Sequence, residues 1–283
     1  EILPDESLRA RLAALPSVSA LPGARDKLTG QLRCEHTSLD DVADIISHSL
    51  GMSARLVQLT SSTFFALPVN LMSPSDAADF LGADVLGTLA SSPEVYSEFE
   101  PDALPVAFVA AVESHSLVVA DFARRIALLE NAEKQARKEA YLAGLFHDIG
   151  KVVSAELFPQ KADPAMAVVP AAGTTASRIE QGLFGASHAA IGAYLMGIWG
   201  LPSPVVETLA FHHCPGESES SQFGPLAAVH VANVLAHEIH GSDPAGLSSQ
   251  LDEEYLSKLG LTSRFDLWRQ ACQEASHEEM ANV

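Results

Sequence analysis

Cysteine is scarce in this chain, and the few that occur form no pair. Cys34, Cys214 and Cys272 are scattered, and no CxxC motif is present. An odd, unpaired set excludes the disulfide framework that holds small secreted domains together. Free thiols are typical of a reducing compartment, so we expect a cytoplasmic protein. Cys214 follows two histidines and is a candidate ligand, although a small, partly buried thiol is the simpler interpretation.

Basic residues are also few, with 17 Lys and Arg against 36 Asp and Glu, which gives a formal net charge of −19. A field of that sign repels phosphodiester backbones and argues against a general DNA- or RNA-binding surface. A phosphate group would need a local cluster of Lys, Arg or metal ions. Charged residues make up only 19% of the chain and apolar residues 47%, which excludes a disordered chain and allows a sizeable core.

Long uninterrupted apolar runs are absent as well. The most apolar stretch, LPVAFVAAVESHSLVVADFA, is broken by Glu113, Ser114, His115 and Asp121. A membrane span needs about 20 apolar residues, so we expect no membrane segment. The first residues, EILPDESLRA, do not resemble a signal peptide. Since the chain starts at Glu1 and not at Met, we expect it to be an excerpt of a longer protein.

Strand signals are poor, whereas a helical period runs through most of the sequence. Apolar residues recur at spacings of three and four, and capping residues precede the runs, as at Thr37-Ser38 and Ser73-Pro74. We predict helices over about 38–50, 54–65, 73–82, 104–130, 132–147, 174–184, 187–199, 203–213, 222–240, 248–259 and 264–280. The predicted fold class is therefore all-α, a two-lobed helical bundle.

A division near residue 100 is predicted from composition. The segment EVYSEFEPDALP is acidic, contains two prolines and precedes the longest predicted helix. We predict an N-terminal helical lobe over 1–100, a second helical lobe over 101–240 and C-terminal helices over 241–283. Nine of the eleven histidines lie after residue 100, which places any chemistry in the second half.

The motif LFHDIGK, residues 145–151, places His147 beside Asp148 at the end of an apolar helix. A second pair, His212 and His213, ends another apolar helix. Buried polar side chains must each find a partner, and imidazole with carboxylate is a usual ligand set for transition metals. A helical bundle can collect such ligands from several helices, but spacing alone does not show that they converge.

Other histidines of the second half have a simpler interpretation. A lone histidine on an apolar helix face is more often a satisfied core residue than a ligand. We adopt that interpretation for His237, His240 and His277. We also favour it for His230, which shares a helix face with Asn233.

Several motifs carry a resemblance to known proteins. AYLAGLFHDIGK resembles the helix end of the HD superfamily of metal-dependent phosphohydrolases. The order of features along the chain is more similar to the HDOD domain family. The matching parts are LPSVSALP, SLGMSARLVQLTSSTFF, SPSDAADFLG, ESHSLVVADFA, AGLFHDIGK, GLFGASHAAIGAYLMGIWGLPSPVVETLAFHH and LAAVHVANVLA. They cover roughly residues 8–240, and the ordered set is far more specific than HDIGK alone.

The resemblance implies an all-helical fold with an HD-like second lobe. It also implies a role in bacterial signalling, often downstream of a receiver or another sensor domain. The related HD-GYP enzymes cleave cyclic di-GMP with two or three metal ions. Carried over by position, their ligand pattern falls on His115, His147, Asp148, His188, His212 and His213, with Asn233 where the superfamily has a final aspartate.

Three departures from the hydrolases stand out. An amide oxygen at Asn233 is a weaker, neutral ligand, and the acidic ligand one turn before the first histidine falls on Ala111. The GYP-bearing signature is also absent. Lys151 matches the lysine of HDIGK and could contact a phosphate as a point charge.

Two functions follow from this resemblance. The first, which the loss at Asn233 favours, is a non-catalytic or weakly metal-binding output or scaffold domain of a bacterial regulatory protein of the response-regulator type. It would hold one or two divalent ions of Fe, Mn, Zn or Ni, or none. Its partner would be a signalling protein, a fused sensor or receiver domain, or a nucleotide-like ligand. The alternative is a metal-dependent phosphohydrolase acting on a nucleotide or cyclic dinucleotide.

Overall fold

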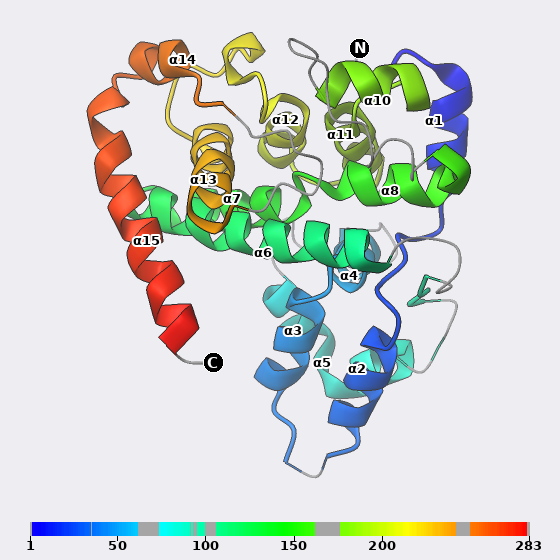
Figure 1. Cartoon of the computed structure of the whole chain (residues 1–283). Helices are drawn as coiled ribbons and strands as arrows, with labels where there is room; N and C mark the ends of the chain where they lie inside the picture. The colour runs from blue at the N-terminus through cyan, green and yellow to red at the C-terminus, as the bar shows by residue number, and fades with distance from the viewer. Residues whose placement is uncertain are drawn as a thin grey trace.

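The chain is all-helical, as the sequence predicted. We describe it from a computed structural model (Figure 1). The structure describes residues 2–34, 36–61, 74–90, 92, 95–99, 106–161, 176–241 and 250–281. Within these ranges there is no β-strand, and the only β-type pairing is an isolated parallel bridge between Ala20 and Glu98.

Local capping signals explain where the first helices begin and end. These helices are α1 (Glu6–Ala13), α2 (Ala24–Leu32), α3 (Leu39–Ser47), α4 (Leu50–Ser61) and α5 (Pro74–Ala90). The Ser38 hydroxyl accepts a hydrogen bond from the Asp41 amide, and the Asp41 carboxylate accepts one from the Ser38 amide, so α3 begins with a capping box. Gly82 has a φ of 75° and kinks α5 where the sequence predicted a helix end.

The second half contains the longest helix, α6, and most of its helices agree with the predicted ranges. They are α6 (Val106–Leu129), α7 (Lys134–Phe146), α8 (Ile149–Leu157), α10 (Ala176–Phe184), α11 (His188–Ile198), α12 (Ser203–Phe211), α13 (Pro225–His240), α14 (Glu253–Lys258) and α15 (Phe265–Ala281). Short 3-10 turns, η1 (Pro215–Glu217) and η2 (Thr262–Arg264), lie between them. α8 was not predicted, because the sequence of HDIGK indicated a helix end but not an immediate restart.

Buried apolar side chains form two cores. The smaller one lies among α2, α3, α4 and α5 and includes Leu28 and Ile46. The larger one occupies the second half and includes Phe146. α1 packs against α11, and its Leu8 joins the larger core although it belongs to the first hundred residues. The division into 1–100, 101–240 and 241–283 stays a prediction.

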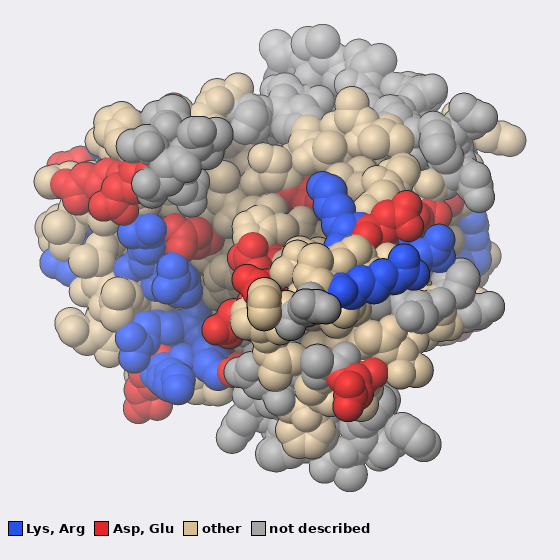
Figure 2. Space-filling model, turned by 90° about the horizontal axis from the view of Figure 1, so that it is seen from below, with Lys and Arg blue, Asp and Glu red and all other residues tan. Residues whose placement is uncertain are grey.

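α6 is the central helix of the larger core and packs against α7, α13 and α15. Among the described residues it is the one helix long and apolar enough to cross a membrane, with a mean hydropathy of 1.5 over a window that is 50% buried. Val119 and Ile126 are fully buried in the core. Packing on several sides accounts for its apolar composition. Seen from below, Lys and Arg side chains gather on the left, the side where α15 lies (Figure 2).

Gly150, the glycine of HDIGK, lies where α8 meets the start of α11. A Cβ atom added there would lie 1.9 Å from the carbonyl oxygen of His188 and 2.9 Å from the amide nitrogen of Gly192. No side chain fits a backbone contact this close, so a glycine is required. The contact holds His188 next to the HDIGK segment and thereby joins two distant parts of the sequence.

We therefore expect Gly150→Ala to lower the free energy of unfolding by about 1–3 kcal/mol, the usual cost of overpacking a core. Gly182 on α10 is a matched control, because a Cβ added there meets nothing within 4 Å. Alanine at that helical position should be neutral or stabilising by up to about 1 kcal/mol. Urea unfolding compares the two. An unchanged midpoint for Gly150→Ala would show that α8 and α11 do not approach this closely.

Candidate metal centre

His147 and Asp148 occupy the junction between two helices. α7 ends at Phe146, His147 is its C-cap residue, and α8 begins at Ile149. The side chains of His147 and Asp148 are 0% and 2% exposed. Because a second helix starts immediately, the pair is enclosed by protein and does not end in a surface loop.

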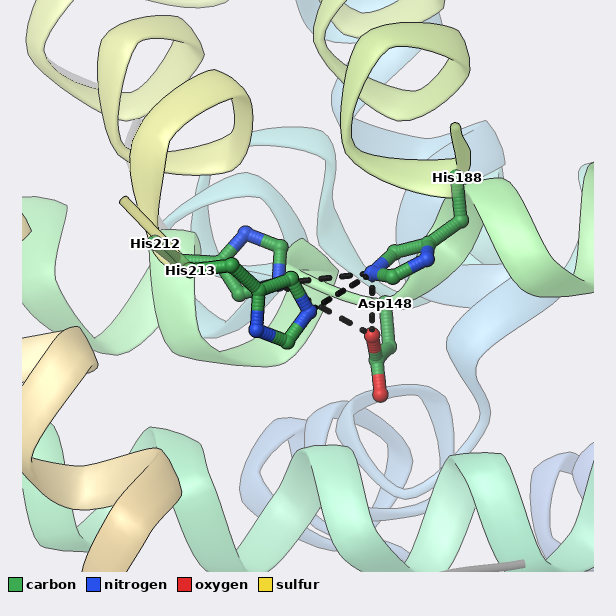
Figure 3. A group of neighbouring side chains, drawn as sticks. All are labelled: Asp148, His188, His212 and His213. Atoms are coloured by element: carbon green, nitrogen blue, oxygen red, sulfur yellow. Dashed lines mark hydrogen bonds and ion pairs between the residues drawn. The ribbon is translucent and has the colours of Figure 1, made fainter. Parts of the chain in front are cut away.

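Histidines from two other helices point at Asp148 (Figure 3). His188 is the first residue of α11, and His212 and His213 directly follow α12. Nε2 of His188 lies 3.2 Å from Oδ1 of Asp148, and 3.4 Å and 3.1 Å from the Nε2 atoms of His212 and His213. Nε2 of His147 lies 3.4 Å from Oδ2 of Asp148. The structure thus brings together five of the residues to which the resemblance assigned ligand roles.

The rings of His147 and His212 each form a hydrogen bond through Nδ1, the nitrogen that faces away from Asp148. Their Nε2 atoms therefore face Asp148. Nδ1 of His147 donates to the carbonyl oxygen of Gly144 at 2.7 Å. Nδ1 of His212 donates in the same way to the carbonyl oxygen of Leu209 at 2.9 Å. A neutral imidazole with its proton on Nδ1 presents its lone pair at Nε2, and such outer bonds are typical of metal-binding histidines.

The ring of His188 is held by a carboxylate. Its Nδ1 lies 2.7 Å from Oε1 of Glu180, and its backbone amide donates to Oε2 at 2.8 Å. Burial alone would lower the pKa of His188, but Glu180 and Asp148 raise it to about 9. Without a metal the ring is therefore an imidazolium at neutral pH, and an ion that binds at Nε2 must displace its proton.

Lys151 compensates the charge of Asp148 in the absence of an ion. Its Nζ donates to Oδ2 of Asp148 at 2.8 Å, and its side chain is only 15% exposed. Burial alone would raise the pKa of Asp148, but Lys151 and His147 hold it well below its usual range. The carboxylate is therefore ionised at neutral pH. The phosphate contact of Lys151 stays a prediction.

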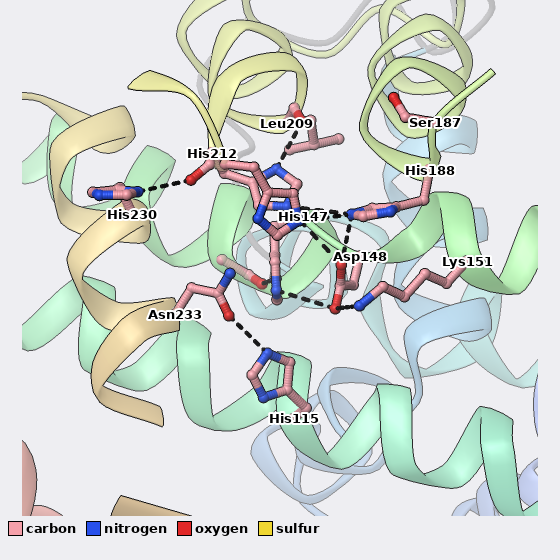
Figure 4. A network of polar contacts seen from close by, with 12 residues as sticks. His115, His147, Asp148, Lys151, Ser187, His188, Leu209, His212, His230 and Asn233 are labelled. Atoms are coloured by element: carbon pink, nitrogen blue, oxygen red, sulfur yellow. Dashed lines mark hydrogen bonds and ion pairs between the residues drawn. The ribbon is translucent and has the colours of Figure 1, made fainter. Parts of the chain in front are cut away.

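The predicted ligands on α6 and α13 bond to each other (Figure 4). Nε2 of His115 donates to Oδ1 of Asn233 at 3.0 Å, and both residues are buried. The His115 ring also stacks on His237, with centroids 4.4 Å apart, and its centroid lies 5.2 Å from that of His147. Burial and His147 lower the pKa of His115 to about 3, so this ring is neutral. With Nε2 protonated, it offers only Nδ1 as a ligand.

The potential ligand atoms fall into two groups that share Asp148, and within each group they all lie within 4.8 Å of one another. The first group is Asp148, His188, His212 and His213, and the second is His115, His147 and Asp148. Nε2 of His147 is buried without a hydrogen-bond partner, and Oδ1 of Asp148 has no well-aligned hydrogen bond, only the ion pair with His188 at 3.2 Å. Such atoms are costly to bury unless something else, such as an ion, satisfies them. Nitrogen and oxygen ligands in this number fit a first-row divalent ion such as Zn, Fe, Mn or Ni.

Two residues contribute to the site in ways that the sequence did not reveal. Glu180 precedes His188 by eight residues, and only the left-handed turn at Gly185, with φ 86°, brings the carboxylate back to the ring. His230 is a buried residue, as interpreted, but its Nδ1 donates to the His212 carbonyl oxygen at 2.8 Å, while its Nε2 accepts from the Asp252 amide at 2.9 Å. It therefore fixes the backbone that carries His212.

Three further residues complete the comparison with the sequence. His240 and His277 are exposed, so the interpretation of both as core residues was wrong. His240 is the last residue of α13, where the helix leaves the core, and its Nε2 lies 3.1 Å from Oγ of Ser276. Cys214 is partly buried, and burial and Glu217 raise its pKa to about 11. Its thiol stays protonated at neutral pH, which disfavours it as a ligand.

Because His188 must lose a proton to bind an ion, we expect the affinity for Ni(II) to rise with pH up to about 9, the pKa of its imidazolium. The slope should be about tenfold per pH unit, one proton being released per ion. Glu180→Gln removes the carboxylate that contributes most to holding this proton, so its affinity should level off at a lower pH than that of the native chain. Calorimetric titrations at several pH values measure both slopes. If the affinities of both proteins level off at the same pH, the role of Glu180 is contradicted.

Comparisons with known proteins identify the family. Residues 18–215 match the family model of the HDOD domain. An uncharacterized protein of Treponema pallidum is 26% identical over 106 residues, which are 38% of this chain and 21% of that protein. The chain therefore spans about a fifth of the length of the curated relative it matches.

Two crystal structures share the fold. The MmoQ response regulator of Methylococcus capsulatus has a TM-score of 0.68 at 17% identity, covering 92% of this chain and 99% of that one. A virulence factor of Campylobacter jejuni has a TM-score of 0.61 at 16% identity, covering 91% and 99%. The similarity to these structures shows a common fold, and the family match covers more than half of the sequence. The chain belongs to the HDOD domain family.

Proposed function

We propose that this chain is a signalling output or scaffold domain whose buried centre holds one divalent transition-metal ion and does not hydrolyse phosphate esters. The observation that carries the proposal is the difference between the two ligand groups around Asp148. The first group has ring nitrogens that face Oδ1 of Asp148. In the second, Lys151 already bonds Oδ2 of Asp148, and Asn233 already bonds Nε2 of His115.

The charges of the side chains around the centre support the binding of a single ion. Within the two ligand groups, Asp148 is the only carboxylate, and Glu180 lies behind His188 as a second negative charge. With Lys151 counted as a positive charge beside Asp148, one divalent ion leaves a single net positive charge, whereas two ions would leave three in a buried site. Asn233 and Ala111 supply no further negative charge, because one is an amide and the other has only a methyl group.

The burial of the ligand residues restricts access to the ion and supports a structural or regulatory role. Asp148, His188 and His212 are buried, and His213 is the exposed member of the first group. An ion can enter beside His213, but phosphoryl hydrolysis would also require a substrate phosphate and a water molecule at the ion. A two-metal centre stabilises both the attacking and the leaving oxygen, so both ions have to be held.

In this proposal the ion fixes the relative positions of α8, α11 and α12, whose ends carry the ligands. A change in ion occupancy or in the surrounding helices would then alter the surface that a partner recognises. The partner would be a signalling protein or a fused sensor or receiver domain in the bacterial cytoplasm. The shared fold with a response regulator, MmoQ, supports this setting.

A metal-dependent phosphohydrolase acting on a nucleotide or cyclic dinucleotide is the second candidate. The shared position of Asp148 favours it, because a carboxylate between two ligand groups is what a bridged two-ion centre requires. In that case Lys151 would leave Asp148 when the second ion binds and would become available to a substrate phosphate.

Metal content and turnover distinguish the two candidates. We expect the native chain, loaded with Mn(II) or Fe(II), to retain about one ion per chain, and Asp148→Ala to retain none, because Asp148 is common to both groups. Native protein should hydrolyse cyclic di-GMP no faster than Asp148→Ala. Asn233→Asp restores a carboxylate beside His115 and should raise the metal content towards two ions.

Asn131→Asp is the matched control for Asn233→Asp, because it makes the same charge change at an exposed position. It should leave the metal content at one ion. Clear turnover by the native chain that Asp148→Ala abolishes would overturn the proposal in favour of the phosphohydrolase.

A further inference from the structure

A cluster of cations interrupts the acidic surface of this protein. Five of its 17 basic residues lie between positions 124 and 138, a segment with only two acidic residues, Glu130 and Glu133. The five are Arg124, Arg125, Lys134, Arg137 and Lys138. They belong to the end of α6 and the start of α7, the helices that pack most extensively on each other. Figure 2 shows Lys and Arg side chains gathered on this side of the molecule.

A cavity of about 360 Å³ lies within this cluster. Arg124 and Leu128 of α6 line it, together with Lys134, Arg137, Lys138 and Tyr141 of α7. Arg137, Lys138 and Tyr141 lie three, four and seven residues after Lys134, so the four share one face of α7. A cavity of this size falls in the range of sites for small organic ligands, about 300–1,000 Å³.

The cations in the cavity are not all compensated. Arg124 pairs with Asp121 at 2.6 Å, and Nζ of Lys138 lies 2.7 Å from Asp76. Within the part of the chain that the structure describes, neither Lys134 nor Arg137 makes an ion pair, and the Nε atom of Arg137 is buried without a hydrogen-bond partner. Two positive charges that form no ion pair among the described residues, in a chain of net charge −19, favour an anionic ligand.

The rest of the lining is suited to an organic group. Leu128 is 53% exposed and adds an apolar surface beside these cations. Tyr141 adds an aromatic ring, and burial raises its pKa, so its hydroxyl is a neutral donor at physiological pH. Inorganic phosphate would not use these apolar surfaces, whereas a phosphorylated organic molecule would.

We infer that the cavity between α6 and α7 binds a phosphorylated small molecule of nucleotide size, with its phosphates on Lys134 and Arg137 and its organic part against Leu128 and Tyr141. The site is separate from the metal centre. Lys134 begins α7 and His147 follows its end, so at 1.5 Å per residue the two are about 20 Å apart along the helix. The inference does not depend on the proposed function, although a ligand at one end of α7 could influence the centre at the other.

The test is calorimetric titration of the full chain with ATP and with pyrophosphate, in EDTA so that no metal contributes. We expect saturable ATP binding that weakens at least tenfold in the double variant Lys134→Gln/Arg137→Gln and declines with salt, because the contacts are charge-assisted. Arg33→Gln, an exposed cation on the other core, should bind like the native chain. Leu128→Asn should weaken ATP but not pyrophosphate.

Thermal unfolding of each variant verifies that the fold is intact. Absence of saturable ATP binding would overturn the inference, as would equal affinity in native protein and the double variant. Loss of ATP binding in Asp148→Ala would place the ligand at the metal centre instead. Tighter binding of a poly-glutamate peptide than of ATP would show that the cluster docks an acidic polypeptide.

Discussion

A carboxylate buried in an all-helical core is the constraint on which the second half of this protein depends. Asp148 is 2% exposed and ionised, and an isolated charge in that position would be strongly destabilising. Lys151 and the imidazolium of His188 compensate it. Helix ends that lie far apart in the sequence must therefore meet at one point. A metal ion at Oδ1 would complete this compensation.

The backbone makes that meeting possible. Gly150 allows α8 to touch the start of α11, which places His188 over Asp148. Outer hydrogen bonds then orient the rings, with Glu180 behind His188 and His230 behind the His212 backbone. Such outer contacts typically change metal affinity by 10- to 100-fold, so the residues that do not face the ion matter almost as much as those that do.

The fold and part of the metal centre could be predicted from the sequence. The remaining features of the centre depend on contacts between residues whose spacing in the sequence does not reveal them. The helical period predicted the all-α fold, and His147 with Asp148 stood out because two polar residues end an apolar helix. Their convergence with the later histidines came from family resemblance and not from spacing. Glu180 was missed because its approach to His188 depends on the turn at Gly185. The bond between His115 and Asn233 joins residues 118 positions apart, and only the fold brings them together.

The central claim is that one ion binds on the His188 side of Asp148, and that Lys151 and Asn233 leave the His115 side without a second ion. Anomalous diffraction from crystals of the zinc-loaded protein tests it directly. The account predicts one peak, within roughly 2.0–2.3 Å of Oδ1 of Asp148 and of the Nε2 atoms of His188, His212 and His213. Two peaks, a single peak between His115 and His147, or no peak at all in protein that binds zinc in solution would contradict it.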